Sequence, residues 1–277
     1  MDLYLENSLK CSRQTTFSYS TSFSLGIRML NKRFRPGIFA VYGFVRIADE
    51  IVDTFHQQPQ QELLDAFRAN TWNAIEQQFS TNPILHSFQW AVNRYGIDHH
   101  LIEAFLYSME LDLTEKVYDT AKLETYIYGS AEVVGLMCLR IFLDQNPEEY
   151  NRLVYPARKL GEAFQKVNFL RDIKDDYYNK GRKYFEQVNV DNFTPQIKRE
   201  IEDDIQQAFD EAYIGIKQLN RNVRFGVYLA YRYYLELLKI LRAVPPDQLL
   251  NTRCRVSDGR KFRLMFTAAI RNWLNLI

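Results

Sequence analysis

Two groups of oxygen-bearing side chains stand out in the sequence because their spacing places each group on one face of a helix. Asn168, Asp172 and Asp176 follow one another at intervals of four residues. On a helix of about 3.6 residues per turn they lie one turn apart. Far upstream, Asp49 and Asp53 repeat the interval. Carboxylates one turn apart repel each other, so each column of oxygen ligands indicates a bound cation.

The ligand types indicate which cation is bound. Carboxylate and amide oxygens suit Mg²⁺, with Mn²⁺ as the alternative, rather than zinc. Mg²⁺ held in this way usually keeps waters and takes phosphate oxygens into its coordination shell, so we expect a phosphate or diphosphate ligand. The four histidines form no metal-ligand pattern and are expected on the surface or in loops; they are His56, His86, His99 and His100.

Apolar residues at helical spacing accompany both columns and indicate that their helices face a core. Leu160, Phe164 and Val167 precede the downstream column, and residues 38–51 around the upstream one are rich in Ile, Val and Phe. Two core-facing helices of this kind can face each other across a helical bundle. The columns would then hold metal ions between them.

The remaining chain is also predicted to be helical, without an alternating strand pattern of useful length. Two segments are unusual. Hydroxyls crowd residues 19–23, where they either bond to their own backbone or bind a ligand. Glycines interrupt residues 126–135, which indicates either a ligand against the backbone or tight helix packing. The expected helices cover 8–30, 36–56, 60–80, 84–95, 98–116, 122–143, 147–179, 194–219, 223–242 and 257–276.

Length and composition favour one all-α domain over residues 1–277, because no Pro-, Gly- or Ser-rich stretch divides the chain. Hydrophobic residues make up 47%, and a net charge of +1 gives no reason to expect a nucleic-acid partner. The three cysteines form no CxxC pair, which favours a reducing cytoplasm. With no signal peptide and no run of ~18–20 apolar residues, we expect a cytoplasmic protein, at most peripheral to the inner face of the membrane.

The order of these motifs resembles the squalene and phytoene synthase family, the head-to-head prenyltransferases among the all-helical class I isoprenoid synthases. The resemblance spans nearly the whole chain. It rests on Arg46-x-x-Asp49-x-x-x-Asp53, on the segment 126–135, and on Gln165-x-x-Asn168-x-x-Arg171-Asp172-x-x-Asp175-Asp176 followed by Arg182 and Tyr184. It implies a single-domain helical bundle around a central cavity.

The resemblance also implies roles for individual residues. The Mg²⁺ ligands would be Asp49, Asp53, Asn168, Asp172 and Asp176. The diphosphate partners would be Arg46, Arg171, Arg253, Ser20 and Ser22, and arginine suits this role because its donors match phosphate oxygens. The four aspartates would act in catalysis with Tyr126, Tyr184 and Tyr234, and the substrate pocket would add Phe23, Tyr42 and Gln165. Three residues depart from the family pattern: Tyr19 for a common His, Asp175 for a common Glu, and Glu132 in a segment that is often small and apolar.

The function implied is condensation of two geranylgeranyl diphosphates to phytoene through prephytoene diphosphate, a step of carotenoid biosynthesis. The alternative uses two farnesyl diphosphates and gives presqualene diphosphate, squalene or dehydrosqualene. NADPH is not expected, and the protein is expected to be a monomer or a weak homodimer. Two further hypotheses are a catalytically silent scaffold and a head-to-tail synthase, which fits the motif spacing less well.

Overall fold

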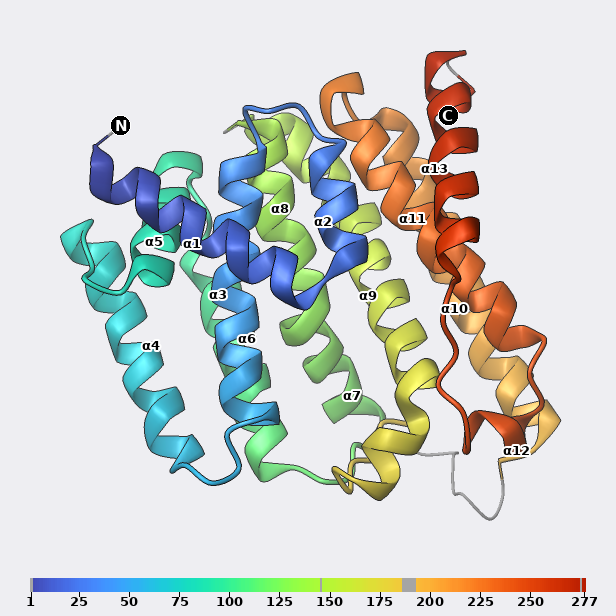
Figure 1. The fold of residues 1–277 in the computed structure, drawn as a ribbon. Coiled ribbons are helices and arrows are strands. Elements are labelled where there is room, and N and C mark those ends of the chain that lie inside the picture. Colours follow the sequence, from blue (N-terminus) through green and yellow to red (C-terminus); the bar gives the residue numbers. More distant parts are fainter. Residues whose placement is uncertain (1, 145, 186–192, 275) are drawn as a thin grey trace. The chain divides into compact units, whose positions relative to one another are not determined.

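The computed structural model describes residues 2–144, 146–185, 193–274 and 276–277, without the side chain of Ser22. The regular elements of the described chain are helices joined by loops (Figure 1), and its β-structure is limited to an isolated bridge between Val117 and Lys183. The predicted all-α class is therefore confirmed. Contacts divide the chain into two compact units, Met1–Thr114 with Val133–Val154, and Glu115–Glu132 with Tyr155–Ile277. One domain over 1–277 stays a prediction.

The first unit is built around α3, which contacts most of the helices of that unit (Figure 1). Pro36 occupies the first turn of α3, where its missing N–H costs nothing. The helices of this unit are α1 (Leu3–Tyr19), α2 (Thr21–Arg28), α3 (Arg35–Asp53), α4 (Gln60–Gln77), α5 (Pro83–Tyr95), α6 (His99–Thr114) and α8 (Val133–Leu143).

Aromatic rings fill the centre of the first unit. The ring of Phe44 on α3 is fully buried and stacks on Phe88 of α5 with 3.8 Å between centroids. Phe67 and Phe105 each lie 5.4 Å from the same ring. This packing fixes the rotation of α3 about its axis, because turning the helix would remove Phe44 from three aromatic partners. The direction in which the acidic residues of α3 point is set in this way.

The predicted first helix, 8–30, is wrong in two respects, because helix α1 already begins at Leu3 and the structure divides the helical stretch at Ser20. The backbone of Ser20 is extended, and its hydroxyl oxygen accepts a hydrogen bond from the backbone N–H of Phe23 at 3.2 Å. Serine is favoured at such an N-cap, where it satisfies a donor of the new helix. Within residues 19–23 the Ser20 hydroxyl therefore bonds to the local backbone, one of the two explanations given for that segment. The hydroxyls of Thr15 and Thr16, just before the segment, also donate to backbone carbonyls one turn earlier.

The second unit carries the long helix α9 (Pro147–Tyr178), which begins in the first unit. Thr194 caps the next helix and Pro195 opens it, the combination expected at a helix start. A short helix that the sequence analysis did not predict follows Pro245. The other helical elements are α7 (Thr120–Ile127), the π-helical turn η1 (Tyr128–Glu132), α10 (Pro195–Gln218), α11 (Arg221–Arg242), α12 (Pro246–Leu249) and α13 (Asp258–Trp273).

Two further expectations need correction. His86 is 6% exposed in α5 rather than on the surface; its Nδ1 accepts from the backbone N–H of Ser80 at 3.3 Å, and burial lowers its pKa. The helical stretch Thr120–Leu143 contains an 18-residue window with a mean hydropathy of 1.4, of which 56% is buried in the fold. By length and hydropathy it resembles a membrane span, although a buried core helix gives the same signal.

Candidate functional site

The upstream acidic column lies on α3, where an arginine neutralises it. Arg46 Nη1 donates to Asp49 Oδ2 at 2.6 Å, and Nη2 of the same guanidinium pairs with Glu50. Glu50 is 6% exposed, so the charge of Arg46 stabilises a buried carboxylate as well as a column member. Asp53 lies one turn further along α3 and is half-buried. The sequence analysis missed Glu50, although its place one turn after Arg46 is visible in the sequence.

Tyr19 also contacts Arg46, and we call Arg46, Asp49, Glu50 and Tyr19 the Arg46 cluster. Tyr19 was left out of the predicted site because it departs from the family pattern. The Arg46 guanidinium lies over the Tyr19 ring with 4.3 Å from its carbon to the ring centroid. Such a cation–π contact orients the guanidinium without occupying its hydrogen-bond donors. Tyr19 therefore contributes to the position of Arg46.

Predicted substrate-binding residues of the first unit lie beside this cluster. Tyr42 is half-buried on α3, and its ring lies 5.8 Å from that of Phe23. Burial raises the pKa of the Tyr42 hydroxyl, although Arg46 and a hydrogen bond with Ser20 act in the opposite direction. Ser20 therefore has two partners besides any ligand, the backbone of Phe23 and the hydroxyl of Tyr42. The Ser22 side chain lies outside the described residues.

The downstream column lies on α9 in the second unit. Asn168 Oδ1 is buried and accepts no hydrogen bond within the described chain. Buried oxygens of this kind are rare, because leaving one unsatisfied costs about 1–3 kcal/mol. Asp176, two turns further along, is 7% exposed. A positively charged ligand beside Asn168 would satisfy this acceptor, whereas Asp176 lies 3.8 Å from the ammonium of Lys180.

Two arginines converge on Asp172, the central member of this column. Arg171 Nε donates to Asp172 Oδ1 at 3.0 Å, and its Nη2 pairs with Oδ2. Arg253, from the segment between α12 and α13, places Nε 2.8 Å from Asp172 Oδ1. Two of the predicted diphosphate partners therefore meet a predicted metal ligand. In each unit, therefore, an arginine supplies an aspartate with the positive charge that a bound metal ion is predicted to supply.

An aromatic cluster, formed by Tyr118, Tyr126, Phe169 and Tyr184, lies in the same unit. The hydroxyls of Tyr126 and Tyr184 are 3.4 Å apart, and Phe169 stacks on Tyr184 at 4.0 Å. Tyr118 is fully buried with its ring 5.1 Å from both tyrosines. The sequence analysis missed Tyr118, because it lies in no motif and only the bridge from Val117 to Lys183 brings it beside Tyr184.

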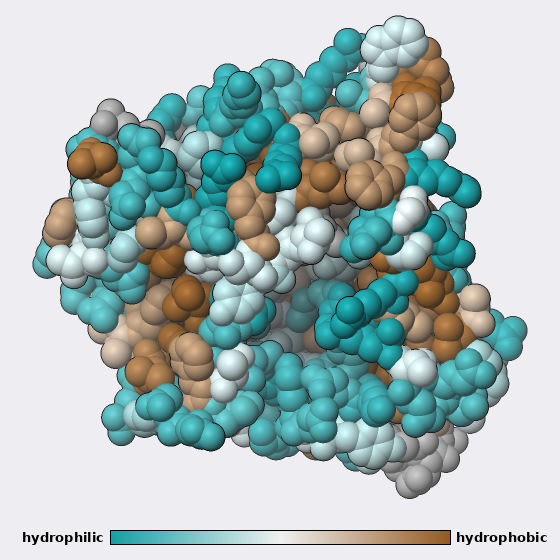
Figure 2. All heavy atoms as spheres, viewed as in Figure 1, coloured by the Kyte–Doolittle hydropathy of each residue, from teal (hydrophilic) through white to brown (hydrophobic). Residues whose placement is uncertain are grey.

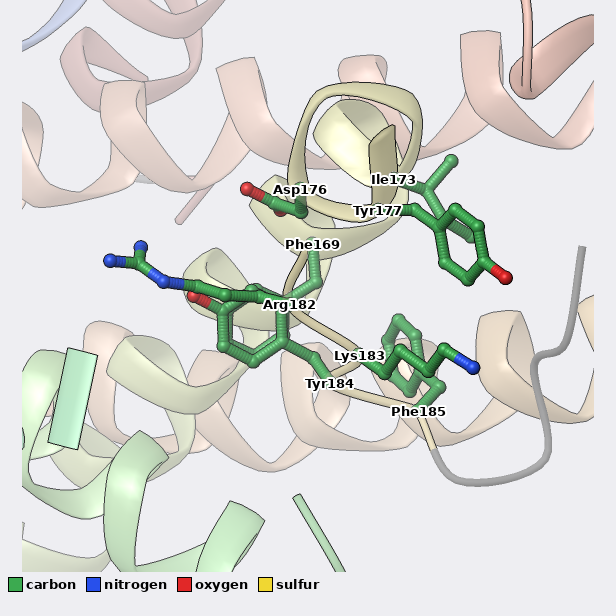
Figure 3. Close-up of a pocket in the computed structure, with 8 residues that line it drawn as sticks. All are labelled: Phe169, Ile173, Asp176, Tyr177, Arg182, Lys183, Tyr184 and Phe185. Carbon is green, nitrogen blue, oxygen red and sulfur yellow. The ribbon is translucent and has the colours of Figure 1, made fainter. Parts of the chain in front are cut away.

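The segment after α9 returns along that helix and lines a small recess with it (Figure 3). The backbone N–H of Arg182 donates to the carbonyl oxygen of Asp176 at 2.7 Å, which turns the chain at Gly181, a residue with positive φ. Figure 3 shows the side chains of Asp176 and Arg182 pointing to the same side, away from Tyr177 and Lys183. Arg182 is 6% exposed. This arrangement adds Arg182 to the charged groups near the α9 column.

The remaining predicted residues of the second unit are Tyr234 and Gln165, which lie at the part of α9 that precedes Asn168. Tyr234 on α11 is buried and stacks on Phe164 with 4.0 Å between ring centroids. Gln165 precedes Asn168 by three residues, so it shares the face of the column, and its side chain is half-buried.

The predicted metal ligands suit Mg²⁺ by their chemistry, and one feature of the structure supports them. All predicted ligands are oxygens, and the unsatisfied Asn168 Oδ1 is an acceptor that a cation would satisfy. Among the described residues, no group of three or more His, Cys, Asp or Glu side chains could hold a metal ion. The two columns belong to different units, so their meeting around shared ions stays a prediction.

The model of the Squalene/phytoene synthase family matches residues 17–260. The chain belongs to this family. It is 28% identical to the 4,4'-diapophytoene synthase of Staphylococcus haemolyticus, covering 94% of this chain and 95% of that one. It is also 28% identical to the 15-cis-phytoene synthase of Synechocystis sp., covering 96% and 86%.

Solved structures confirm the isoprenoid synthase fold. A dehydrosqualene synthase in complex with a ligand superposes with a TM-score of 0.84 and 23% identity, covering 99% of this chain and 98% of that one. The squalene synthase HpnC of Alicyclobacillus acidocaldarius gives 0.76 and 22%, covering 88% and 96%. Members of the squalene/phytoene synthase family are prenyltransferases, and this protein is a prenyltransferase that joins isoprenoids head to head.

The segment 126–135, one of the family motifs quoted above, contains a π-helical turn in this protein. Gly161 of α9 packs against that turn so closely that a Cβ at residue 161 would lie 2.7 Å from the carbonyl oxygen of Ala131. Two explanations were given for the small residues of segment 126–135, a ligand or tight helix packing. The contact of Gly161 supports tight packing where α9 meets the turn. Single π-helical turns inside α-helices are frequent at functional sites.

Glu132, the acidic departure from the family pattern, ends this turn and is 7% exposed. Arg158 Nε donates to Glu132 Oε2 at 2.5 Å, yet burial outweighs this pair and raises the pKa of Glu132 above its ordinary value of 4.5. The folded protein therefore holds this proton more tightly than the unfolded chain does. The charged carboxylate then reduces stability, an effect absent below pH 4.5 that grows as the pH rises through the raised pKa.

Glu132→Gln, which removes this charge and keeps the size of the side chain, should be at least as stable as the parent at neutral pH. The Arg158 side chain is 44% exposed, so it stays hydrated without its partner. Thermal unfolding from pH 4.5 to neutrality should show the advantage of the variant growing with pH. Glu211→Gln is the control with the opposite sign: hydrogen bonds from Tyr155 and Gln207 lower the pKa of Glu211, so this variant should be less stable than the parent, with a deficit that stays nearly constant above pH 4.5. If the stability advantage of Glu132→Gln over the parent shrinks as the pH rises, the raised pKa of Glu132 is contradicted.

Proposed function

We propose that this protein condenses two geranylgeranyl diphosphates head to head to phytoene, with Mg²⁺ bound by the two acidic columns. The observation that carries the proposal is the pairing of Asp49 with Arg46 and of Asp172 with Arg171 and Arg253. A family whose substrates are diphosphates needs both ligand types, carboxylates for the metal and arginines for the anion. The similarity to the 15-cis-phytoene synthase of Synechocystis sp. supports the chain length proposed.

Residues of the chain would divide the work as follows. Asn168, Asp172 and Asp176 from α9, and Asp49 and Asp53 from α3, would hold the metal ions. Bound Mg²⁺ would neutralise the negative charge that develops on the departing diphosphate. Arg46, Arg171 and Arg253 would leave their aspartates for the diphosphate oxygens, because the metal then supplies the positive charge that the arginines supply in its absence. The carboxylates therefore stay neutralised in both states.

The reaction proposed leaves a carbocation that must be kept from water. C1 of one prenyl diphosphate loses its diphosphate and alkylates the double bond of the second, which then loses a proton to give a cyclopropylcarbinyl diphosphate. Loss of the second diphosphate, rearrangement and loss of another proton give the hydrocarbon. The faces of Tyr126, Tyr184 and Phe169 would stabilise a nearby cation by about 0.5–2 kcal/mol each and exclude water.

A second candidate uses two farnesyl diphosphates and gives dehydrosqualene or a related product. The observation that favours it is the alignment with the 4,4'-diapophytoene synthase over almost the whole of both chains. The two candidates share every residue named above and differ in the length of chain that the substrate pocket accepts. We place this candidate second.

Incubation with each prenyl diphosphate separates these candidates. Geranylgeranyl and farnesyl diphosphate are supplied singly with Mg²⁺, with and without NADPH, and diphosphate release is measured together with the hydrocarbon product. Phytoene from geranylgeranyl diphosphate at the higher rate is expected, and release should stop when a chelator removes the metal. A faster reaction with farnesyl diphosphate would select the second candidate. No release from either substrate would indicate a silent scaffold, and a need for isopentenyl diphosphate would indicate head-to-tail chemistry.

A further inference from the structure

Helix α13 is apolar on two opposite sides. On one side it packs on α11 and buries Leu264 and Ala268. On the other side Phe262, Phe266, Ile270 and Trp273 follow one another at intervals of three and four residues, so they form one stripe along the helix. We call these four residues the α13 stripe. Its aromatic members are 68%, 67% and 82% exposed, in chain order.

No comparable cluster of exposed apolar side chains occurs on the other described helices. Large exposed apolar residues elsewhere are scattered along the sequence, for example Leu3, Phe79 and Ile214, as is normal for a protein surface. Leu274 and Leu276 extend the apolar character beyond the end of α13. Figure 2 shows the resulting brown and tan surface over α13 at the upper right. A surface of this kind indicates an interaction site.

The charges around the stripe indicate what it contacts. Residues 253–271 contain six basic side chains and one acidic side chain, in a protein of net charge +1. At about 100° per residue, Arg263 lies directly beside the stripe. Arg260, which pairs with Glu236 at 3.7 Å, and Arg271 lie further round the same side of the helix, nearer the face that packs on α11. We call these three residues the arginine flank. An exposed aromatic face beside a basic flank is typical of helices that lie in the plane of an anionic lipid surface.

We propose that α13 binds this protein to an anionic lipid bilayer, with the α13 stripe at the level of the acyl chains and the arginine flank against the headgroups. Trp and Phe suit that depth, since an aromatic ring is stable at the boundary between headgroups and hydrocarbon. A second copy of the chain fits the surface less well, because an antiparallel two-fold contact through the stripe would bring the two arginine flanks together.

A consequence concerns substrate access, and this part rests on the proposed function. Prenyl diphosphates are amphiphiles whose hydrocarbon tails partition into bilayers. Arg253, which pairs with Asp172, lies shortly before the start of α13 in the chain. Docking through α13 would therefore hold a proposed diphosphate partner near the surface where the substrates reside.

Vesicle binding of the full chain, without substrate, tests the proposal. The stripe variant carries Phe262→Ser, Phe266→Ser and Trp273→Ser; Ile214→Ser, at a residue 56% exposed on α10, is the matched control. Sedimentation with vesicles of phosphatidylcholine and phosphatidylglycerol should show binding of the parent and the control. The stripe variant should bind at least ~10-fold more weakly, because three aromatic side chains no longer leave water. Replacing Arg263 and Arg271 with Gln should weaken binding roughly fivefold per charge, and only on the anionic vesicles.

Trp273 also provides a direct probe. Its fluorescence should shift to the blue when anionic vesicles are added, and Trp273→Phe should bind as the parent does without that part of the shift. Equal vesicle binding by the parent and the stripe variant would overturn the proposal. A parent dimer that the stripe variant converts to monomer, with neither binding vesicles, would overturn it in favour of self-association. Diphosphate release is measured separately on detergent-dispersed substrate, so a failure of the proposed function leaves the vesicle result intact.

Discussion

Asp172→Asn should lower diphosphate release by about a thousandfold or more while the protein stays folded. The carboxylate of Asp172 is the point on which Arg171 and Arg253 converge, and it is a proposed metal ligand. The amide keeps an oxygen that both arginines can donate to, but it lacks the negative charge that binds the metal. Removing one preorganised group that stabilises developing charge costs ~10²–10³ in rate, and the loss of a metal ligand adds to this.

Two measurements distinguish a lost ligand from a damaged fold. Mg²⁺ with inorganic diphosphate should raise the melting temperature of the parent, since ligands that bind the folded state stabilise it. This rise should be absent in Asp172→Asn. Asp203→Asn, an exposed aspartate on α10, serves as the control and should behave as the parent in both assays. Turnover of Asp172→Asn within a few-fold of the parent would remove Asp172 from the proposed site.

Gly161→Ala should destabilise the protein by about 1–3 kcal/mol, the usual cost of overpacking a close contact. The added Cβ would lie 2.7 Å from the Ala131 carbonyl oxygen and 2.9 Å from the Glu132 Cα. Both are backbone atoms of the π-helical turn, so neither can move aside by changing a rotamer. In a chain of this size each kcal/mol corresponds to roughly 2–4 °C in melting temperature.

Gly259→Ala is the matched control for this variant. It lies in the first turn of α13, and a Cβ there would meet nothing within 4 Å. Alanine should therefore be neutral, or stabilising by up to about 1 kcal/mol, because it restricts the unfolded chain. Thermal unfolding of the three proteins under one set of conditions gives the comparison. If the two variants melt together, the contact between α9 and η1 is not as tight as the structure shows.

The downstream motif was predicted from sequence because its information is local. The interval of four residues places Asn168, Asp172 and Asp176 on one face of any helix, whatever surrounds it. Apolar residues at matching intervals predicted that the helix meets a core, and α9 has the predicted extent, Pro147–Tyr178. The same reasoning located α3 and its aspartates. These elements needed no information about their neighbours.

Contacts between distant residues were not predictable in this way. Glu50 and Tyr19 join the Arg46 cluster, and Tyr118 joins Tyr126 and Tyr184. Tyr118 reaches this position through a backbone bridge between Val117 and Lys183, which are 66 residues apart in the sequence. No helical periodicity encodes such a contact. The division of the first helix at Ser20 depended on one backbone conformation and one cap.

The sequence by itself determined the all-helical class, the two columns of metal-type ligands and the family resemblance, because helical periodicity and motif order are properties of the chain alone. The tertiary structure decided which groups neutralise the aspartates, why residue 161 is glycine, and which side of α13 stays exposed. These depend on packing between segments remote in sequence, where the position of one side chain is set by atoms that its own neighbours in the chain do not supply.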